Sequence, residues 1–380
     1  MELNDIREHI DAIDDELVQL FARRMGCSAE IARTKQQTAR PIRDRSRERA
    51  IINRLTAASG AELAPYVRAL YEHIFDLSRS YQSAKWERQS PVMAKIEAAL
   101  SQDQGKRLPE HALVACQGLE GAYAQQACER LFPYPDILYF DSFDGVFSAV
   151  EKGMCQYGIL PIENSTAGSV TQVYDLMEKH RFYIVGAHRL RIEHRLMRRD
   201  GASQTPITEV VSHEQALRQC SNFFAAHPGI KATPMANTAV AAEFVAHSDR
   251  DDLAVIASKV CADLYGLSVV GEDISNAYNN YTRFICISRK LEIYPQARKI
   301  SLMLNLAHEP GALNAVVSRL ALAGINLLKL ESRPLPGREF EFRFFFDMAA
   351  NAADPDVARL MGELEANCEH FTFLGCYDEQ

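Results

Sequence analysis

Residues 157–170 read YGILPIENSTAGSV, and this stretch predicts the architecture of the middle of the chain. Its first part, from Tyr157 to Ile162, is an apolar run short enough for a buried strand. Its second part places polar residues, Glu163 to Thr166, directly after that strand. Ligands of α/β proteins bind at the carboxyl ends of strands. The stretch therefore predicts a strand that ends at a binding site.

The sequence on either side continues the alternation between short apolar runs and amphipathic stretches. The runs that predict strands are ALVAC (112–116), DILYF (136–140), YIVGA (183–187), TEVVS (208–212), LAVIAS (253–258) and RFICIS (283–288). The stretches that predict helices are AYAQQACERLF (122–132), DGVFSAVEKG (144–153), SVTQVYDLMEKH (169–180) and EQALRQCSNFFAAH (214–227). This pattern predicts an α/β domain over residues 111–290.

Polar residues stand at several of these strand ends and helix starts. In VVSHEQALRQC, Ser212 ends a strand and Gln219 lies two turns into the next helix. Thr238 opens a further helix, whose free N–H groups suit a carboxylate. Thr282 and Arg283 enter the last strand of the domain. Each of these residues, taken alone, is also an ordinary cap or turn residue.

Together, these stretches resemble the prephenate dehydratases, whose signatures include P-I-E-N, S-H-x-Q-A-L-x-Q-C, Y-G-L (here 265–267) and N-x-T-R-F. The resemblance covers about 112–286 and implies two α/β lobes with prephenate in the cleft between them. It makes Thr282 the essential catalytic residue. The reaction expels a ring hydroxyl as carbon dioxide leaves, so we interpret Thr282 as a positioned hydrogen-bond donor. Glu163 is the second candidate, as a general acid if burial raises its pKa. The candidate substrate-binding residues are Asn164, Ser212, Gln219, Thr238 and Arg283.

The chain departs from this family at two places. The family usually has G-P-x-G-[ST]-[FY]-[ST] at its first strand-turn, whereas residues 118–124 read GLEGAYA, without the proline and two hydroxyls. Asn276 stands where the family often has Asp. The altered turn at 118–124 favours an alternative in which the middle segment is a weak or non-catalytic binding or regulatory module. The retained Glu163, Gln219 and Thr282 oppose it.

Residues 3–85 have the apolar period of helices, with no proline before Pro41. One long and two shorter helices leave apolar surface uncovered, so we expect a homodimer or a higher homo-oligomer. The stretch ARPIRDRSRERA (39–50) concentrates arginines in a chain of net charge −8. It could be a nucleic-acid patch, a solvated helix face or a pocket for a dianion. The acidic total and the lack of stacking aromatics in the stretch argue against nucleic acid.

Helical geometry relates several basic residues of this segment. Arg24 and Lys35 lie about 20° apart around the first helix and roughly 16 Å apart along it. Arg7 is roughly 25 Å from Arg24, too far to share a small ligand within one chain. If Arg7 has a ligand, we expect it in the site of a second subunit.

Eight polar positions on three helices, in this order, resemble the all-helical chorismate mutases: Arg7, Arg24, Lys35, Asp44, Arg47, Glu48, Ser78 and Gln82. The rearrangement of chorismate to prephenate is intramolecular and needs fixed donors rather than a nucleophile or a metal. The resemblance implies that Arg24, together with Arg7 of the partner subunit, binds the two carboxylates of chorismate, with Arg47 and Ser78 assisting. It also implies that Lys35 and Gln82 hydrogen-bond the ether oxygen and that Glu48 hydrogen-bonds the ring hydroxyl.

The last 80 or so residues change to a period of two. KISLMLNLA (299–307) and EFEFRFFFDM (339–348) predict half-buried antiparallel strands. With helices near 311–323 and 354–367, the order β-α-β-β-α-β predicts a ferredoxin-like module. The motifs HEPGALNAVVSRL and LLKLESRPLPG resemble the regulatory ACT domain of prephenate dehydratases. The resemblance implies phenylalanine bound between paired ACT domains and acting as an allosteric inhibitor. The implied contacts are Gly311, Ala312, Leu313, Glu331, Ser332 and Arg333.

The whole chain thus resembles the bacterial bifunctional chorismate mutase/prephenate dehydratases. We expect a multidomain protein with a helical mutase domain (1–88), a linker (89–110) in which VMAKIEAAL could be a helix, a two-lobed α/β dehydratase domain (111–290) and an α+β ACT domain (298–378). The resemblance implies conversion of chorismate through prephenate to phenylpyruvate. We expect no cofactor and no metal.

The composition agrees with a soluble protein of the cytoplasm. The nine cysteines show no C-x-x-C pair, which predicts reduced thiols rather than disulfides or a zinc site. The acidic, amphipathic start is unlike a signal peptide, and no apolar run is long enough for a membrane span. We expect neither a nucleic-acid partner nor a membrane partner.

Overall fold

The computed structural model describes residues 3–38, 44–84, 90–102, 105, 107–202, 205–271, 274–335, 337–338 and 341–380. Arg40 and Arg43 of the arginine-rich stretch, and Phe340 of a predicted strand, lie outside these residues. The chain divides into two compact units, each described here by itself. The first unit comprises Met1–Ala94, Leu306–Ile325 and Pro355–His370, and the second Lys95–Asn305, Asn326–Asp354 and Phe371–Gln380. In the described part of the chain, no helix combines the length and apolar character needed to cross a membrane.

The first unit is helical. It contains α1 (Leu3–Gln37), α2 (Arg45–Ala58), α3 (Gly60–Ala84), the start of α4 (Pro91–Leu100), α12 (Ala312–Leu322) and α13 (Pro355–Asn367). The 35 residues of α1 make a helix about 52 Å long. The apolar residues that repeat along α1 remain exposed in the single chain; Ile10 is 50% and Leu17 is 54% exposed. The helix α13 contacts α3, where Ser80 Oγ lies 3.4 Å from a carboxylate oxygen of Glu363.

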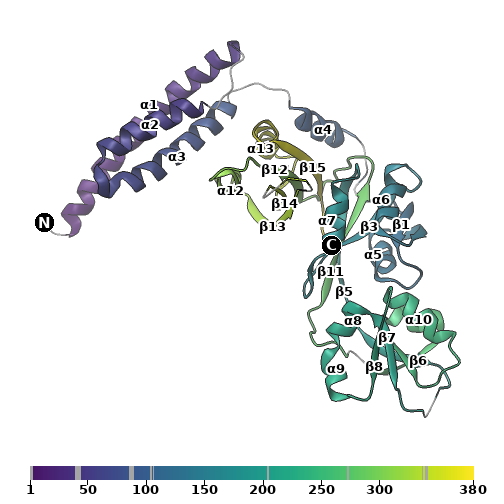
Figure 1. The fold of residues 1–380 in the computed structure, drawn as a ribbon. Helices are drawn as coiled ribbons and strands as arrows, with labels where there is room; N and C mark the ends of the chain where they lie inside the picture. The colour runs from purple at the N-terminus through teal and green to yellow at the C-terminus, as the bar shows by residue number, and fades with distance from the viewer. Residues whose placement is uncertain are drawn as a thin grey trace. The chain divides into compact units, whose positions relative to one another are not determined.

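The second unit begins with a mixed sheet, which we call the first lobe (Figure 1). Its strands are β1 (His111–Gln117), β2 (Tyr134–Phe140), β3 (Tyr157–Asn164), β4 (Gly168–Ser169), β5 (Tyr183–Arg191) and β11 (Tyr281–Ser288). They follow the order β2-β1-β3-β11-β5, with the short β4 paired to β3. The helix α5 (Tyr123–Leu131) supplies one core of this lobe, and α6 (Phe143–Glu151) and α7 (Thr171–Met177) supply the other.

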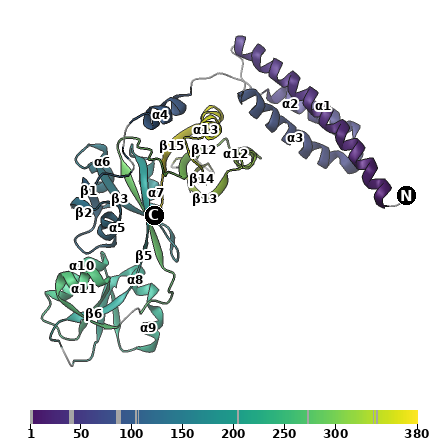
Figure 2. The same ribbon diagram turned by 180° about the vertical axis from the view of Figure 1, so that it is seen from behind.

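A second sheet forms the second lobe. Its strands are β6 (Arg195–Arg199), β7 (Glu209–His213), β8 (Lys231–Met235), β9 (Leu253–Ala257) and β10 (Leu267–Gly271), in the order β10-β6-β9-β7-β8. Its helices are α8 (Glu214–Gln219), α9 (Ser221–Ala226), α10 (Thr238–Ala246) and α11 (Lys259–Tyr265). Figures 1 and 2 show α8 and α9 on one side of the sheet and α10 on the other. Two separate apolar cores match this arrangement.

The third sheet follows the two lobes in sequence. Its strands are β12 (Lys299–Asn305), β13 (Asn326–Pro334), β14 (Phe342–Ala349) and β15 (His370–Tyr377), in the order β13-β14-β12-β15. With α12 and α13, the chain order is the expected β-α-β-β-α-β. Gly375 in β15 lies against β5, because a Cβ added to it would stand 2.1 Å from the carbonyl oxygen of Ile184. Only glycine allows that approach.

The expectation of half-buried strands is wrong for β12. Six of its seven residues are buried, so it has no solvent-facing side. Met303 of β12 and Phe345 of β14 belong to the same core as α6 and α7 of the first lobe, and the ring of Tyr174 meets that of Phe345 at 4.8 Å. The third sheet therefore packs on the first lobe, and a strand between two layers is buried on both faces.

The single helix expected at residues 214–227 is also wrong, because the chain forms two short helices that meet at Cys220. Asn276 holds this break. Its backbone N–H donates to the carbonyl of Gln219 at 2.7 Å, and its side-chain oxygen accepts from the backbone N–H of Asn222 at 3.0 Å. Its side-chain nitrogen donates to Ser221 Oγ at 2.8 Å. An aspartate could not make this last donation, so the asparagine suits the break in this chain.

Candidate active sites

Two neighbouring strands place the dehydratase motifs side by side. The strands β3 and β11 pair antiparallel, with Asn164 opposite Thr282 and Glu163 opposite Arg283. Successive side chains of a strand point to opposite faces of the sheet. Thr282 and Asn164 therefore share one face, and Arg283 and Glu163 share the other.

Asn164 connects this face to the turn that follows β3. It is 5% exposed, and its side-chain oxygen accepts from the backbone N–H groups of Thr166 at 3.0 Å and Ala167 at 2.9 Å. Its side-chain nitrogen donates to Asn280 Oδ1 at 2.7 Å and to Thr282 Oγ1 at 3.0 Å. Because the Thr282 hydroxyl accepts this bond, its own proton is left for another acceptor.

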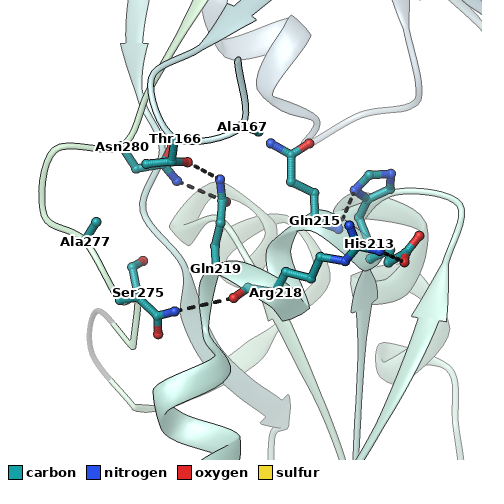
Figure 3. A pocket seen from close by; sticks show the side chains of 11 residues that line it. Thr166, Ala167, His213, Gln215, Arg218, Gln219, Ser275, Ala277 and Asn280 are labelled. Carbon is teal, nitrogen blue, oxygen red and sulfur yellow. Dashed lines mark hydrogen bonds and ion pairs between the residues drawn. The ribbon is translucent and has the colours of Figure 1, made fainter. Parts of the chain in front are cut away.

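Gln219, in α8 of the second lobe, forms hydrogen bonds with the residues around Asn164. Its Nε2 donates to Thr166 Oγ1 at 2.7 Å, and its Oε1 accepts from Asn280 Nδ2 at 3.1 Å. A pocket of about 510 Å³ lies here, lined in part by Thr166, Gln219 and Asn280 and in part by His213 and Arg218 (Figure 3). Its size is within the range of small-molecule sites.

Two residues of this network were not predicted from the sequence. Asn280 is 2% exposed and stands within the N-x-T-R-F signature, so the motif did carry a signal for it. His194 is also 2% exposed, and its Nε2 lies 2.8 Å from Gln219 Oε1. A lone histidine after a strand gives no such signal in a single sequence.

Other predicted dehydratase residues make different contacts. The buried hydroxyl of Ser212 donates to the carbonyl of Ile256, which ties β7 to β9. Thr238 is the first residue of α10, and the side chain of Asn237 caps that helix by accepting from the backbone N–H of Val240 at 2.8 Å. The hydrogen bonds between Asn164, Asn280 and Gln219 do not include Ser212 or Thr238.

Arg283 and Glu163 face the third sheet instead of the Asn164 face. Arg283 is 7% exposed, and its guanidinium lies 2.6 Å from a carboxylate oxygen of Asp347 in β14. Burial alone would lower the pKa of Arg283, but the charge of Asp347, the hydrogen bond to it and the nearby Tyr377 and Glu379 together outweigh burial and raise the pKa. Glu163 lies 2.9 Å from the ammonium of Lys329 in β13. These two residues join β11 and β3 to the third sheet.

The altered turn at residues 118–124 begins α5. Gly118 and Gly121 have φ of +102° and +90°, which favour glycine. Ala122 is the N-cap residue and makes no side-chain cap bond, whereas a serine or threonine there could. Tyr123 keeps the family's aromatic position, and its hydroxyl donates to the carbonyl of Glu193 at 2.7 Å. The turn thus starts α5 with two left-handed glycines and without a hydroxyl cap.

The helical unit brings together part of the predicted mutase site. A guanidinium nitrogen of Arg24 in α1 donates to the buried hydroxyl of Ser78 in α3, and the guanidinium lies 5.5 Å from the ring centre of Phe75. Gln82, one turn beyond Ser78, is 7% exposed. Its buried side-chain oxygen has no hydrogen-bond partner within the described part of the chain. A buried polar atom of this kind is ready to bind a ligand.

The remaining mutase candidates lie around α2 and along α1. Asp44 is the N-cap of α2 and accepts from the backbone N–H of Arg47 at 3.0 Å, and this bond lowers the pKa of its carboxyl. Glu48 forms an ion pair with Arg79 of α3. Lys35 is half-buried near the end of α1, whereas Arg7 is exposed near its start. The structure thus connects Arg24 to Ser78 and leaves Arg7 in solvent.

The predicted effector residues fall in both compact units. In the first, Gly311 is the N-cap of α12 with φ of +87°, followed by Ala312 and Leu313. In the second, alternate side chains of β13 contact the first lobe: Glu331 accepts from Ser169 Oγ at 2.7 Å, and Arg333 lies 3.0 Å from Asp175. Ser332, between them, is exposed.

Comparisons with known proteins match both catalytic regions. The family model described as chorismate mutase type II matches residues 6–83, and the one described as prephenate dehydratase matches residues 114–292. A bifunctional chorismate mutase/prephenate dehydratase of Escherichia coli is 31% identical, over 99% of this chain and 96% of its own length.

Two solved structures resemble the part that follows the helical region. The prephenate dehydratase of Arthrobacter aurescens in complex with L-Phe is 27% identical, with a TM-score of 0.65 over 70% of this chain and 89% of its own. A protein described as GqqA, a novel type of quorum-quenching acylase, is 30% identical, with a TM-score of 0.64 over 70% of this chain and 98% of its own.

Proposed function

The chain belongs to the bifunctional chorismate mutase/prephenate dehydratases, and from that premise we propose which residues perform each reaction and how phenylalanine restrains the second. The protein has chorismate mutase and prephenate dehydratase activities and acts in phenylalanine biosynthesis. The observation that carries the assignment of the dehydratase site is the hydrogen bond from Asn164 to Thr282 beside the pocket.

The mutase reaction takes place among α1, α2 and α3. Arg24, held by Ser78, binds one carboxylate of chorismate, and Arg47 and Ser78 assist. The buried amide of Gln82, with Lys35, donates to the ether oxygen, where negative charge develops as the bond breaks. Glu48 accepts from the ring hydroxyl. Asp44 supports the site by capping α2.

The mutase site is completed by a second copy of the chain. Arg7 is exposed and belongs to the same helix as Arg24, so the length of α1 keeps them apart. The apolar residues of α1 are exposed in the single chain, which supports pairing through this helix. In the dimer, Arg7 of the partner subunit reaches the second carboxylate.

The dehydratase reaction takes place where β3, β11 and α8 meet. Asn164 donates to the Thr282 oxygen, so the Thr282 hydroxyl donates its proton towards the ring hydroxyl that leaves. Asn164, Asn280 and Gln219 hold one another, and Gln219 keeps the second lobe in place over the pocket. Glu163 is ion-paired with Lys329, so we assign it to the contact with the third sheet rather than to proton donation.

Ser212 and Arg283 support this site indirectly, whereas the backbone at Thr238 can contact the substrate. Ser212 fixes β7 to β9 immediately before α8, and Arg283 fixes β11 to β14. The start of α10 at Thr238 keeps free N–H groups beyond the one that Asn237 caps, and these remain available to a substrate carboxylate.

Phenylalanine inhibits the dehydratase through β13. The effector contacts the backbone near Gly311–Leu313 and Glu331–Arg333, between two paired chains. Glu331 and Lys329 both hydrogen-bond Ser169, which pairs in β4 with Glu163, the residue before Asn164. An effector that shifts β13 therefore shifts the segment that orients Asn164, which is a direct route for inhibition.

The assay that tests this assignment supplies prephenate to the purified chain after dialysis against a chelator. Phenylpyruvate should form at the rate of the undialysed protein, because the proposed donors are all protein groups, and phenylalanine should reduce that rate. All nine cysteines are free thiols, which supports the proposal of a reducing, cytoplasmic location, so the assay buffer should contain a thiol reductant. Loss of the dehydratase after chelation would contradict the assignment.

A further inference from the structure

We propose that His194 is a positioning residue of the dehydratase, which fixes the side-chain amide of Gln219 by donating a hydrogen bond from its Nε2. The inference rests on the proposed dehydratase site and adds a residue to it. His194 lies between β5 of the first lobe and β6 of the second, where the chain crosses between the lobes. Its side chain is buried, and its Nε2 is 2.8 Å from Gln219 Oε1.

The direction of this hydrogen bond follows from the backbone. The N–H groups of Thr166 and Ala167 can only donate, and both point at the same side-chain atom of Asn164, at 3.0 and 2.9 Å. That atom must be the oxygen of Asn164. Its nitrogen is then the atom that lies 2.7 Å from Asn280, so the Asn280 atom that receives this bond is an oxygen.

The orientation of Asn280 in turn determines which atoms of Gln219 and His194 donate. With its oxygen turned to Asn164, Asn280 offers its nitrogen to Gln219, at 3.1 Å. The Gln219 atom that receives this bond is therefore the oxygen. An amide oxygen can only accept, so the His194 nitrogen that meets the same oxygen carries a proton. The two backbone N–H groups thus determine the donor and the acceptor in every hydrogen bond that links the side chains of Asn164, Asn280, Gln219 and His194.

These hydrogen bonds also determine where the side-chain nitrogen of Gln219 lies relative to the pocket. With its oxygen held by His194 and Asn280, the Gln219 nitrogen faces Thr166 Oγ1 at 2.7 Å and the pocket. Figure 3 shows Thr166, Asn280 and Gln219 together at the edge of this pocket. Without the His194 donor, one bond holds the Gln219 oxygen, and the amide can rotate away from this position.

The surroundings of His194 hold the imidazole itself in place. The ring of Tyr123 meets it edge-on, with ring centres 6.3 Å apart and planes at 75°. The Tyr123 hydroxyl is bonded to the carbonyl of Glu193, the residue before His194. The first turn of α5 thus fixes the histidine, and the histidine fixes Gln219.

The test compares three variants of the full chain in the prephenate assay. His194→Phe keeps a ring but has no donor, and we expect kcat/KM to fall about 10- to 100-fold. His194→Gln carries an amide nitrogen near the position of Nε2, and should retain activity within about threefold of the parent chain. His194→Asn is polar but too short to place its donor there, so it should behave like the phenylalanine variant. Chorismate mutase activity and the thermal midpoint report whether each variant folds.

A double-mutant cycle with Gln219→Ala separates positioning from a purely structural role. If His194 acts through Gln219, adding His194→Phe to Gln219→Ala should cost less than about threefold more. Where His194→Phe does not fold, His194→Asn takes its place in the cycle. Wild-type rates in His194→Phe, equal losses in the glutamine and asparagine variants, or multiplied losses in the double variant would each overturn the proposal. The unmutated chain, run alongside, reports on the dehydratase assignment itself.

Discussion

We propose that the buried side-chain amide of Gln82 donates a hydrogen bond from its Nε2 to the ether oxygen of chorismate in the mutase site. An amide does not titrate, so mutase turnover should change little between about pH 6 and 8. In Gln82→Glu, only the protonated acid donates, so turnover should fall as the pH rises through the pKa of the new carboxyl. Burial raises that pKa above the ordinary value of about 4.3.

The pH profile of kcat for chorismate in the full chain measures this. Gln102→Glu, an exposed change beyond α4, is the matched control and should leave the profile flat. A Gln82→Glu enzyme with the parent profile would show that Gln82 does not touch the ether oxygen.

Some residues of the candidate site could be predicted from the sequence, and others could not. Thr282, Asn164 and Gln219 could be predicted, because their motifs place them at strand and helix ends that the fold brings together. The role of Arg283 could not be predicted in this way. Its ion pair with Asp347 joins residues 64 positions apart, and only the packing of the third sheet on the first lobe brings them together. His194 was missed for the same reason.

At the scale of elements, β13 is the connection between the regulatory sheet and the dehydratase. The hydroxyl of Ser169 in β4 donates a hydrogen bond to Glu331 of that strand and accepts one from Lys329. Ser169→Ala removes both bonds, so phenylalanine should inhibit the dehydratase less. We expect a several-fold rise in the phenylalanine concentration that gives half inhibition, and an unchanged mutase rate.

Inhibition curves of the dehydratase for Ser169→Ala and for the control Ser101→Ala, outside this contact, make the comparison. An unchanged half-inhibition concentration in Ser169→Ala would exclude this strand contact as the route of inhibition. A strand contact that transmits inhibition must also act in reverse, so phenylalanine should bind more weakly when prephenate occupies the pocket.

The second lobe carries an acid-sensitive contact between β7 and β8. Hydrogen bonds from Thr233 and Arg250 lower the pKa of Glu209 from 4.5 to about 2. A carboxyl with a lowered pKa in the folded protein stabilises it above the unfolded pKa, and that stabilisation is lost as the pH falls through the folded value. The thermal midpoint should therefore fall between about pH 4.5 and 2, and fall less in Glu209→Gln.

Calorimetry of the two chains across this pH range is the measurement, with the exposed Glu97→Gln as the control. Equal slopes for Glu209→Gln and the parent chain would show that Glu209 does not contribute to the acid sensitivity.

Local sequence patterns were sufficient to predict some of the helices and strands, but not all of them. Short apolar runs predicted strands of the first lobe, a period of three to four residues predicted α1, and a period of two with intervening helices predicted the β-α-β-β-α-β order. The break at Cys220 depends on Asn276, 56 residues later, and the double burial of β12 depends on another layer. Neither leaves a pattern in the local sequence. The short strands β6, β8 and β10 were missed as well, since β6 is rich in arginine and β8 contains a proline.

At the scale of the whole molecule, we propose that the mutase site is shared between two copies of the chain. A chain with Arg7→Ala and a chain with Arg24→Ala should each be nearly inactive as mutases. Mixed, they should regain up to about a quarter of the activity per site, because one hybrid site in each heterodimer has both arginines. Native mass spectrometry confirms that subunits have exchanged. Exchange without recovered activity would rule out a shared site.

We propose that one chain performs the two reactions at separate sites, with Thr282 as the donor in the second. The most direct measurement is a time course of prephenate and phenylpyruvate formed from chorismate by the parent chain and by Thr282→Val, which keeps the shape and removes the hydroxyl. We expect the parent chain to form phenylpyruvate, and we expect prephenate to accumulate in the variant at the parent mutase rate. Phenylpyruvate formed by Thr282→Val at the parent rate would contradict this proposal.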